Sequence, residues 1–267
     1  FMQFQPSEMM KFTLVMMLAA YYDWLDHRRV SRPLYVLIPV LLILLPTVLV
    51  LIQPNLGTAL MLLLAGAAVM FAAGVSLWYF AAVLLLGAAA VAGVFLTRGT
   101  PWQFLYDYQY TRIDTFLNPG ADPLGAGYNI IQAQIALGSG GWSGKGFMQG
   151  TQSRLNFLPE KQTDFIFTTL AEEFGFIGAF SLLGLYALII GFCLFAAFQN
   201  RDRFSALLII GVAANFFFYI AVNLSMVMGM APVVGVPLPL LSYGGSAMLV
   251  LLVGFGLVQS AHVHRPR

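Results

Sequence analysis

Asp164 is the carboxylate in this sequence best placed to act as a base. It directly precedes an apolar run over residues 165–198, so it stands where the chain would enter a membrane. A carboxylate at that boundary is partly desolvated, and desolvation raises its pKa toward the range useful to a general base. Asp is also a favoured N-cap residue of helices. The residue alone therefore leaves catalysis and helix capping as equal alternatives.

Glu8 and Lys11 form a second polar feature at the start of an apolar run. Their i, i+3 spacing places both side chains on one face of a helix, where they can pair. Ionisable residues at membrane depth are costly and are functional hypotheses by default. The pair is therefore either part of a site or a pair that neutralises itself near the lipid headgroups.

Lys145 lies within a glycine-rich stretch, residues 138–146. Such a backbone can approach a phosphate closely, but the Walker spacing GxxxxGK[ST] is not met because Gly146 follows the lysine. Nucleotide binding is therefore not expected. Binding of a lipid-linked pyrophosphate and simple turn formation remain as alternatives.

Prolines interrupt the chain before its last apolar run. Pro232, Pro237 and Pro239 alternate with glycines ahead of the sequence LLSYGGSA. Proline removes a helical hydrogen bond, and the freed backbone groups need protein or water partners within a membrane. The stretch is either a broken segment that lines a polar cavity or a rigid outer turn that leads into the last span.

The composition indicates that these residues are positioned by membrane helices. Of the 267 residues 60% are hydrophobic and 9% are charged, against roughly 45–50% and ~25% in soluble domains. The formal net charge of +2 excludes a strongly basic nucleic-acid binder. The single cysteine, Cys193, can build neither a disulfide framework nor a cysteine-based metal site.

Seven charge-poor runs have lengths suited to membrane spans, for which about 20 apolar residues are needed. The sequence therefore predicts an all-α polytopic membrane protein, a bundle of about seven transmembrane helices in one integral-membrane domain, residues 1–267. The runs cover residues 9–22, 34–52, 56–73, 77–96, 165–198, 204–228 and 240–261. The fifth run is too long for one crossing, and Glu172 with Glu173 suggests that its first two turns stand outside the hydrocarbon.

Short-loop arginines predict the orientation, because cytoplasmic loops carry an excess of Lys and Arg. Seven crossings place three basic sites on one side: Arg28, Arg29 and Arg32; Arg201 and Arg203; Arg265 and Arg267. That side and the C-terminus are then cytoplasmic, and the large loop over residues 97–164 is extracytoplasmic. Within the loop, residues 128–136 have helical apolar spacing and predict a short amphipathic helix across the membrane surface.

Histidine chemistry is not expected in this loop. His27, His262 and His264 all fall on the predicted cytoplasmic side, so no zinc triad or Ser/His/Asp set can form outside. Catalysis in the loop must then depend on carboxylates and cations.

Four stretches carry a resemblance to a known family. They are FQPSEMMK from Phe4, QPNLGTAL from Gln53, the loop from GAGYNIIQAQIALGSGG to LPEKQTDFIF, and NLSMVMGMAPVVGVPLPLLSYGGSA from Asn223. Together they resemble the RodA/FtsW/SpoVE family of bacterial peptidoglycan glycosyltransferases over nearly the whole chain, and GTQSRLNFLPEKQTDFIF resembles the RodA branch. Family members have about ten helices, so about three are expected before FQPSE. Asn55 stands where the family usually has Asp.

The resemblance implies a polymerase that joins lipid II units outside the cytoplasmic membrane during cell elongation and rod-shape maintenance. The family's essential Asp falls on Asp164, which would take the proton of the acceptor sugar's 4-hydroxyl. Candidate cations for the leaving pyrophosphate are Arg112, Lys145 and Lys161, and a divalent cation, Mg²⁺ or Mn²⁺, could share that task. The remaining substrate-binding candidates are Glu8, Lys11, Glu160 and Ser242; no metal ligand is identified.

The implied partners are a class B penicillin-binding protein and elongation-complex proteins such as MreC and MreD, in the bacterial cytoplasmic (inner) membrane. Two other functions remain open. A lipid II flippase would need polar residues through the depth of the bundle, and a non-enzymatic scaffold of the cell-wall synthesis complex would need no carboxylate at the boundary. Both predict that Asp164 is replaceable.

Overall fold

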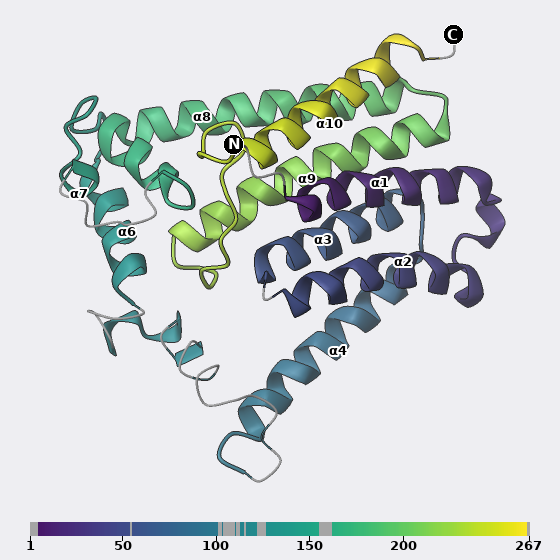
Figure 1. The fold of residues 1–267 in the computed structure, drawn as a ribbon, viewed down its shortest axis with the longest axis horizontal. Helices are drawn as coiled ribbons and strands as arrows, with labels where there is room; N and C mark the ends of the chain where they lie inside the picture. The colour runs from purple at the N-terminus through teal and green to yellow at the C-terminus, as the bar shows by residue number, and fades with distance from the viewer. Residues whose placement is uncertain are drawn as a thin grey trace.

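The computed structural model describes residues 5–53, 55–100, 103, 110, 113–114, 116–121, 127–154 and 162–265, with Ser153 described in its backbone only. Every regular element among these residues is helical. Two short 3₁₀ turns, His27–Arg29 and Pro119–Ala121, accompany the α-helices (Figure 1). The α-helices are α1 (Pro6–Trp24), α2 (Pro33–Ile52), α3 (Leu56–Ala72), α4 (Leu77–Leu96), α6 (Tyr128–Ser139), α7 (Thr151–Arg154), α8 (Ile166–Gln199), α9 (Arg203–Val227) and α10 (Gly245–Val263).

Each of the seven predicted spans coincides with a helix, which confirms the all-α membrane fold. Within the described residues, α2, α4, α8, α9 and α10 are long and apolar enough to cross a membrane, and α3 is a shorter apolar helix. The prediction that the last span begins at residue 240 was wrong. Residues 240–244 form a turn before α10, because Pro239 precedes them and Leu240 has a positive φ of 62°. Seven complete crossings stay a prediction.

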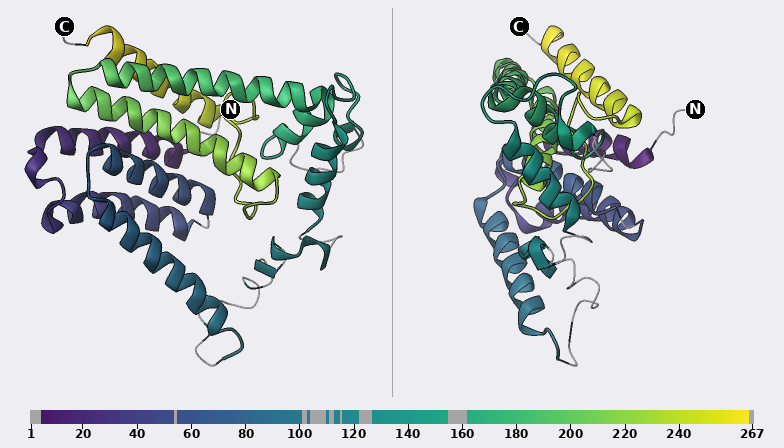
Figure 2. Two further views of the ribbon diagram at one scale, coloured as in Figure 1. Left: turned by 180° about the vertical axis from the view of Figure 1, so that it is seen from behind. Right: turned by 90° about the vertical axis from the view of Figure 1, so that its left-hand side faces the viewer.

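Helix α9 forms the centre of the bundle. It packs against α8 and α10 on one side and against α1 and α3 on the other (Figure 1). Small residues allow this close approach: a Cβ on Gly211 would lie 2.3 Å from Val15 Cγ1, and one on Gly254 would lie 2.2 Å from Phe12 Cε1. By contrast, α4 has no buried residue and diverges from the bundle (Figure 2).

Hydrogen bonds at one end of the bundle bring the basic segments together. Arg203 Nη1 donates to Leu25 O at 2.7 Å, and Asn200 Nδ2 donates to Ala261 O at 3.0 Å. Arg265 Nη1 donates to Gln199 Oε1. The ends of α1, α8 and α10 and the start of α9 therefore share one end of the molecule, as the arginine pattern predicts. The assignment of this end to the cytoplasm stays a prediction.

The predicted large loop contains regular structure. Helix α6 confirms the helix expected over residues 128–136 and extends it to Ser139. It buries Ile130, Ala133 and Ala136 and packs against α8. Its position along a membrane surface, and the outward orientation of residues 97–164, stay predictions.

Helix α8 is interrupted near its start. Gly175 has φ 66° and ψ −162°, so residues 166–174 form a separate helical segment. A helix of 34 residues would be about 50 Å long, and the hydrocarbon core is about 30 Å thick. The interruption therefore fits the expectation that the first turns of this run stand outside the hydrocarbon.

Candidate functional site

A cavity of about 210 Å³ lies where α8 begins, at the opposite end of α9 from the arginines. Among the residues that line it are Glu8 and Lys11 from α1, Asn55 at the start of α3, Tyr219 from α9, and Asp164. Most of the remaining wall comes from the proline-rich stretch and the start of α10: Gly235, Val236, Pro237, Tyr243, Gly244, Ser246 and Ala247. Residues from α1, α3 and α9, from the chain at Asp164, and from the stretch that leads into α10 thus meet at one polar cavity.

The backbone around Asp164 is pinned to the proline-rich stretch by hydrogen bonds. Asn223 Nδ2 donates to Asp164 O at 2.8 Å and to Val236 O at 2.7 Å. Tyr243 N donates to Gln162 O at 2.8 Å. Helix α8 begins at Ile166, and its N-cap residue is Phe165. The position of Asp164 therefore owes more to these tertiary contacts than to helix capping.

The Asp164 carboxylate is half-buried and lies beside Gly235. A Cβ on Gly235, which has φ +68°, would be 3.6 Å from Asp164 Oδ2. The start of α3 approaches the same stretch, since a Cβ on Gly57 would lie 2.4 Å from Val234 O. Asn55 Oδ1 accepts a hydrogen bond from Thr58 N at 3.1 Å and so caps α3. Asn55 thus has a structural role that does not require a charge.

Glu8 and Lys11 are paired inside the bundle. Lys11 Nζ is 2.7 Å from Glu8 Oε1, and the two side chains are 1% and 9% exposed, respectively. Tyr219 joins them: its hydroxyl donates to Glu8 Oε2 at 2.8 Å and accepts from Lys11 Nζ. The pair is therefore buried inside the bundle and bonded to a distant helix, while its depth in the membrane stays a prediction.

Sequence reasoning missed Tyr219 and Asn223. Both side chains project from α9, four residues apart and hence on one helix face. A tyrosine and an asparagine at this spacing within an apolar run were the available signal. The face they define contacts the cavity at Tyr219 and the backbone of Asp164 at Asn223.

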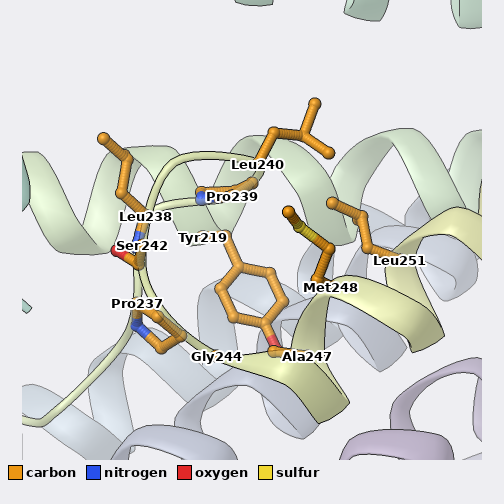
Figure 3. Close-up of a pocket in the computed structure, with 10 residues that line it drawn as sticks. All are labelled: Tyr219, Pro237, Leu238, Pro239, Leu240, Ser242, Gly244, Ala247, Met248 and Leu251. Atoms are coloured by element: carbon orange, nitrogen blue, oxygen red, sulfur yellow. Dashed lines mark hydrogen bonds between the residues drawn. The ribbon is translucent and has the colours of Figure 1, made fainter. Parts of the chain in front are cut away.

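The proline-rich stretch lines a cavity and also forms the turn that leads into α10. A narrow second pocket of about 20 Å³ adjoins the first, and Figure 3 shows the Tyr219 ring between residues 237–244 and the start of α10. Ser242, a substrate-binding candidate, is buried here. Its hydroxyl donates to Thr163 O at 2.6 Å and accepts from Leu238 N at 2.7 Å. Ser242 therefore holds the stretch against the chain that leads to Asp164.

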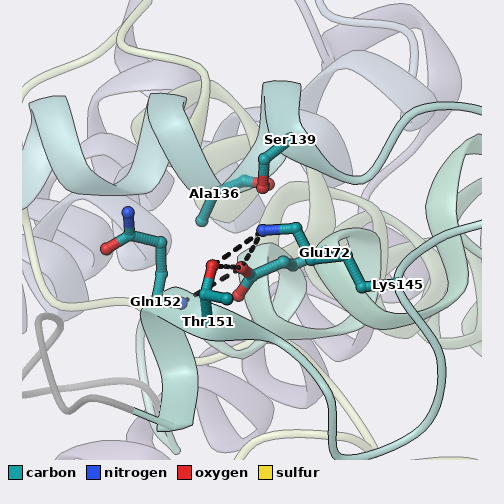
Figure 4. A network of polar contacts seen from close by, with 6 residues as sticks. All are labelled: Ala136, Ser139, Lys145, Thr151, Gln152 and Glu172. Atoms are coloured by element: carbon teal, nitrogen blue, oxygen red, sulfur yellow. Dashed lines mark hydrogen bonds and ion pairs between the residues drawn. The ribbon is translucent and has the colours of Figure 1, made fainter.

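Lys145 is not at the cavity. Its ammonium lies 2.7 Å from Glu172 Oε1 and donates to Thr151 Oγ1 at 2.8 Å (Figure 4). The structure therefore does not bring Lys145 together with Asp164, as the pyrophosphate hypothesis would need. Three other candidates, Arg112, Glu160 and Lys161, lie outside the described residues.

Metal-binding residues do not cluster in the part of the chain that the structure describes. There, no group of three or more His, Cys, Asp or Glu side chains could hold an ion. At the cavity, the Glu8 carboxylate is already paired with Lys11. The described residues therefore do not fit a divalent-cation site, and a Mg²⁺ or Mn²⁺ ion stays a prediction.

Fold and site define a multi-pass α-helical membrane protein with a buried ion pair and a carboxylate at one cavity. The family model FtsW/RodA/SpoVE, described as cell cycle protein, matches residues 1–267, and the chain belongs to this family. It is 46% identical over 266 residues to the peptidoglycan glycosyltransferase MrdB of Escherichia coli strain K12, covering 98% of this chain and 69% of MrdB.

Solved structures agree with this membership. One similar chain comes from a structure described as "Structural coordination of polymerization and crosslinking by a peptidoglycan synthase complex"; the TM-score is 0.80 at 33% identity, covering 100% of this chain and 72% of that one. Another is the rod shape determining protein RodA of Thermus thermophilus, with a TM-score of 0.67 at 30% identity, covering 100% and 68%.

Proposed function

We propose that this chain is a peptidoglycan glycosyltransferase that polymerises lipid II at the outer face of the bacterial cytoplasmic membrane during cell elongation. Similarity to MrdB, whose name states this activity, supports the reaction class. The single observation that carries the proposal is the cavity that both Asp164 and the buried Glu8–Lys11 pair line.

Asp164 is the general base in this proposal. Its carboxylate takes the proton from the 4-hydroxyl of the acceptor sugar as that oxygen bonds to the anomeric carbon of the donor. The bond from that carbon to the pyrophosphate oxygen breaks, and undecaprenyl pyrophosphate leaves with the electron pair. A base must lie about 2.6–3.2 Å from the proton-bearing atom, which explains why the backbone of Asp164 is held by Asn223.

Glu8 and Lys11 shape and polarise the cavity. The positive charge of Lys11 and the negative charge of Glu8 cancel, so the hydrogen-bonded trio with Tyr219 carries no net charge. Stabilising the negative pyrophosphate then falls to other cations, for which Arg112 and Lys161 remain candidates. Lys145 is already paired with Glu172 and is not assigned this task.

The proposed setting is a cell-wall synthesis complex. The description of the similar solved structure names polymerization and crosslinking by a peptidoglycan synthase complex, which supports a crosslinking partner for this chain. We assign that role to a class B penicillin-binding protein, with MreC and MreD as further partners. The basic end of the bundle would face the cytoplasm, and the cavity would open toward the outside.

The test is glycan polymerisation from labelled lipid II by the purified protein with its partner. General-base assistance supplies about 10²- to 10⁴-fold in rate, so Asp164→Asn should nearly abolish polymer formation. Asp114→Asn is the matched control, because Asp114 is an exposed loop carboxylate paired with Arg98. Activity of Asp164→Asn within a few-fold of this control would contradict the proposal and favour a flippase or a scaffold.

A further inference from the structure

Glu172 is a fully buried carboxylate that the proposed reaction does not use. Its Oε1 accepts hydrogen bonds from Lys145 Nζ at 2.7 Å, Thr151 Oγ1 at 3.0 Å and Gln152 N at 3.1 Å (Figure 4). None of these residues lines the cavity with Asp164. Burying a carboxylate is costly, and the cost is offset here only by the ion pair and the hydrogen bonds. We therefore ask what this buried group contributes to the site.

The position of Glu172 in the chain indicates what it contributes. Glu172 follows Asp164 by eight residues, and its hydrogen bonds to Lys145, Thr151 and Gln152 anchor the far end of the segment over residues 164–172. Asp164 begins this segment, and Asn223 and Ser242 hold its backbone and that of Thr163 from the other side. From Asp164 to Glu172 is eight residues, or about 12 Å along a helix.

Backbone hydrogen bonds at the interruption in α8 hold the same segment. Beyond Gly175, Phe176 N donates to Gly141 O at 2.8 Å; before it, Glu172 O accepts from Lys145 N at 3.0 Å. A Cβ on Gly144 would lie 2.1 Å from Glu173 O, so the backbone at residue 144 can approach α8 this closely only if that residue is glycine. Residues 140–146 thus take over backbone bonds that a continuous helix would make itself.

We infer that Glu172 is a positioning residue: it clamps the segment over residues 164–172 to Lys145, Thr151 and Gln152 and thereby holds Asp164 in the cavity. The inference rests on the proposed function for its effect on catalysis. A misplacement of about 1 Å at a reacting group can cost about 100-fold in rate. Lys145 and Thr151 act through Glu172, and Lys145 has no direct contact with the pyrophosphate.

The test compares Glu172→Gln with Glu173→Gln in the full-length protein with its partner. Glu173 is the adjacent, half-buried carboxylate on the same helix and serves as the matched control. For Glu172→Gln we expect kcat for lipid II polymerisation to fall about tenfold or more with KM nearly unchanged. If Glu172→Gln does not fold, Thr151→Val removes one hydroxyl from the clamp and keeps the ion pair; a smaller fall in kcat is then expected.

Amide hydrogen exchange in lipid nanodiscs provides a readout that does not depend on lipid II. In Glu172→Gln, the amides of residues 163–168 should exchange faster, whereas those of α9 should not. Exchange and kcat equal to those of Glu173→Gln would overturn the inference. A rise in KM with unchanged kcat would also overturn it, in favour of an anion site at Lys145. Full activity of Asp164→Asn would contradict the proposed function alone, because the exchange measurement would still decide whether Glu172 clamps the segment.

Discussion

Removing Lys11 should destabilise the protein far more than removing an exposed cation of similar geometry. The Lys11–Glu8 pair has an N–O distance of 2.7 Å, and its side chains are 1% and 9% exposed. Lys11→Met leaves a buried carboxylate without its cation, which typically costs about 3–5 kcal/mol. For a chain of this size, that loss corresponds to a fall in Tm of roughly 6–20 °C.

The Arg98–Asp114 pair is the matched control. Its N–O distance is 2.6 Å, but both side chains are 46% exposed. The hydrogen bond from Arg98 lowers the pKa of the Asp114 carboxyl, yet water already solvates both groups. Exposed pairs contribute little, so Arg98→Met should change Tm by no more than about 2 °C.

The double variant Glu8→Gln/Lys11→Met completes the cycle. It removes both charges, so much of the stability lost in Lys11→Met should return. The assay is thermal unfolding of purified protein in one detergent, followed by tryptophan fluorescence. A Lys11→Met variant as stable as Arg98→Met, or a double variant less stable than the single one, would refute the burial argument.

Two further predictions concern the cavity and the orientation. Asn55→Asp should change polymerisation by less than about threefold, because Asp caps a helix about as well as Asn, whereas a large gain would show that this position needs charge. In a Cys193→Ser background, single cysteines at Gly120 and Asn200, probed with an impermeant thiol reagent on intact cells, should label only at Gly120. Labelling at Asn200 would reverse the orientation that the arginines predict.

The sequence predicted the helices well because each depends on local composition. Apolar runs of about 20 residues leave a membrane chain few alternatives, since backbone groups must be satisfied within each helix. The errors fall where tertiary contacts decide. Residues 240–244 are apolar enough for a span, but Pro239 and the contact from Ser242 to Thr163 hold them in a turn.

The site was only partly predictable for a related reason. Asp164, Glu8 and Lys11 are ionisable groups beside apolar runs, and the cost of placing charge there marks them in the sequence. Tyr219 and Asn223 carry no charge, and their contacts join residues 211 and 59 positions apart, respectively. Lys145 is a different case: a lysine among glycines suggested an anion site or a turn, and in the structure its ammonium is paired with Glu172, a carboxylate of the chain itself.

The polar groups of the site divide into two kinds by their hydrogen-bond partners. Asn223 and Ser242 bond backbone carbonyls, so they fix the path of the chain beside the cavity and leave the Asp164 carboxylate oriented by that path. Glu8, Lys11 and Tyr219 bond one another and stay neutral as a group, so they add polarity to the wall without adding charge. A base that must take a proton is favoured by this division, because a fixed backbone path keeps its carboxylate within reach of one position in the cavity.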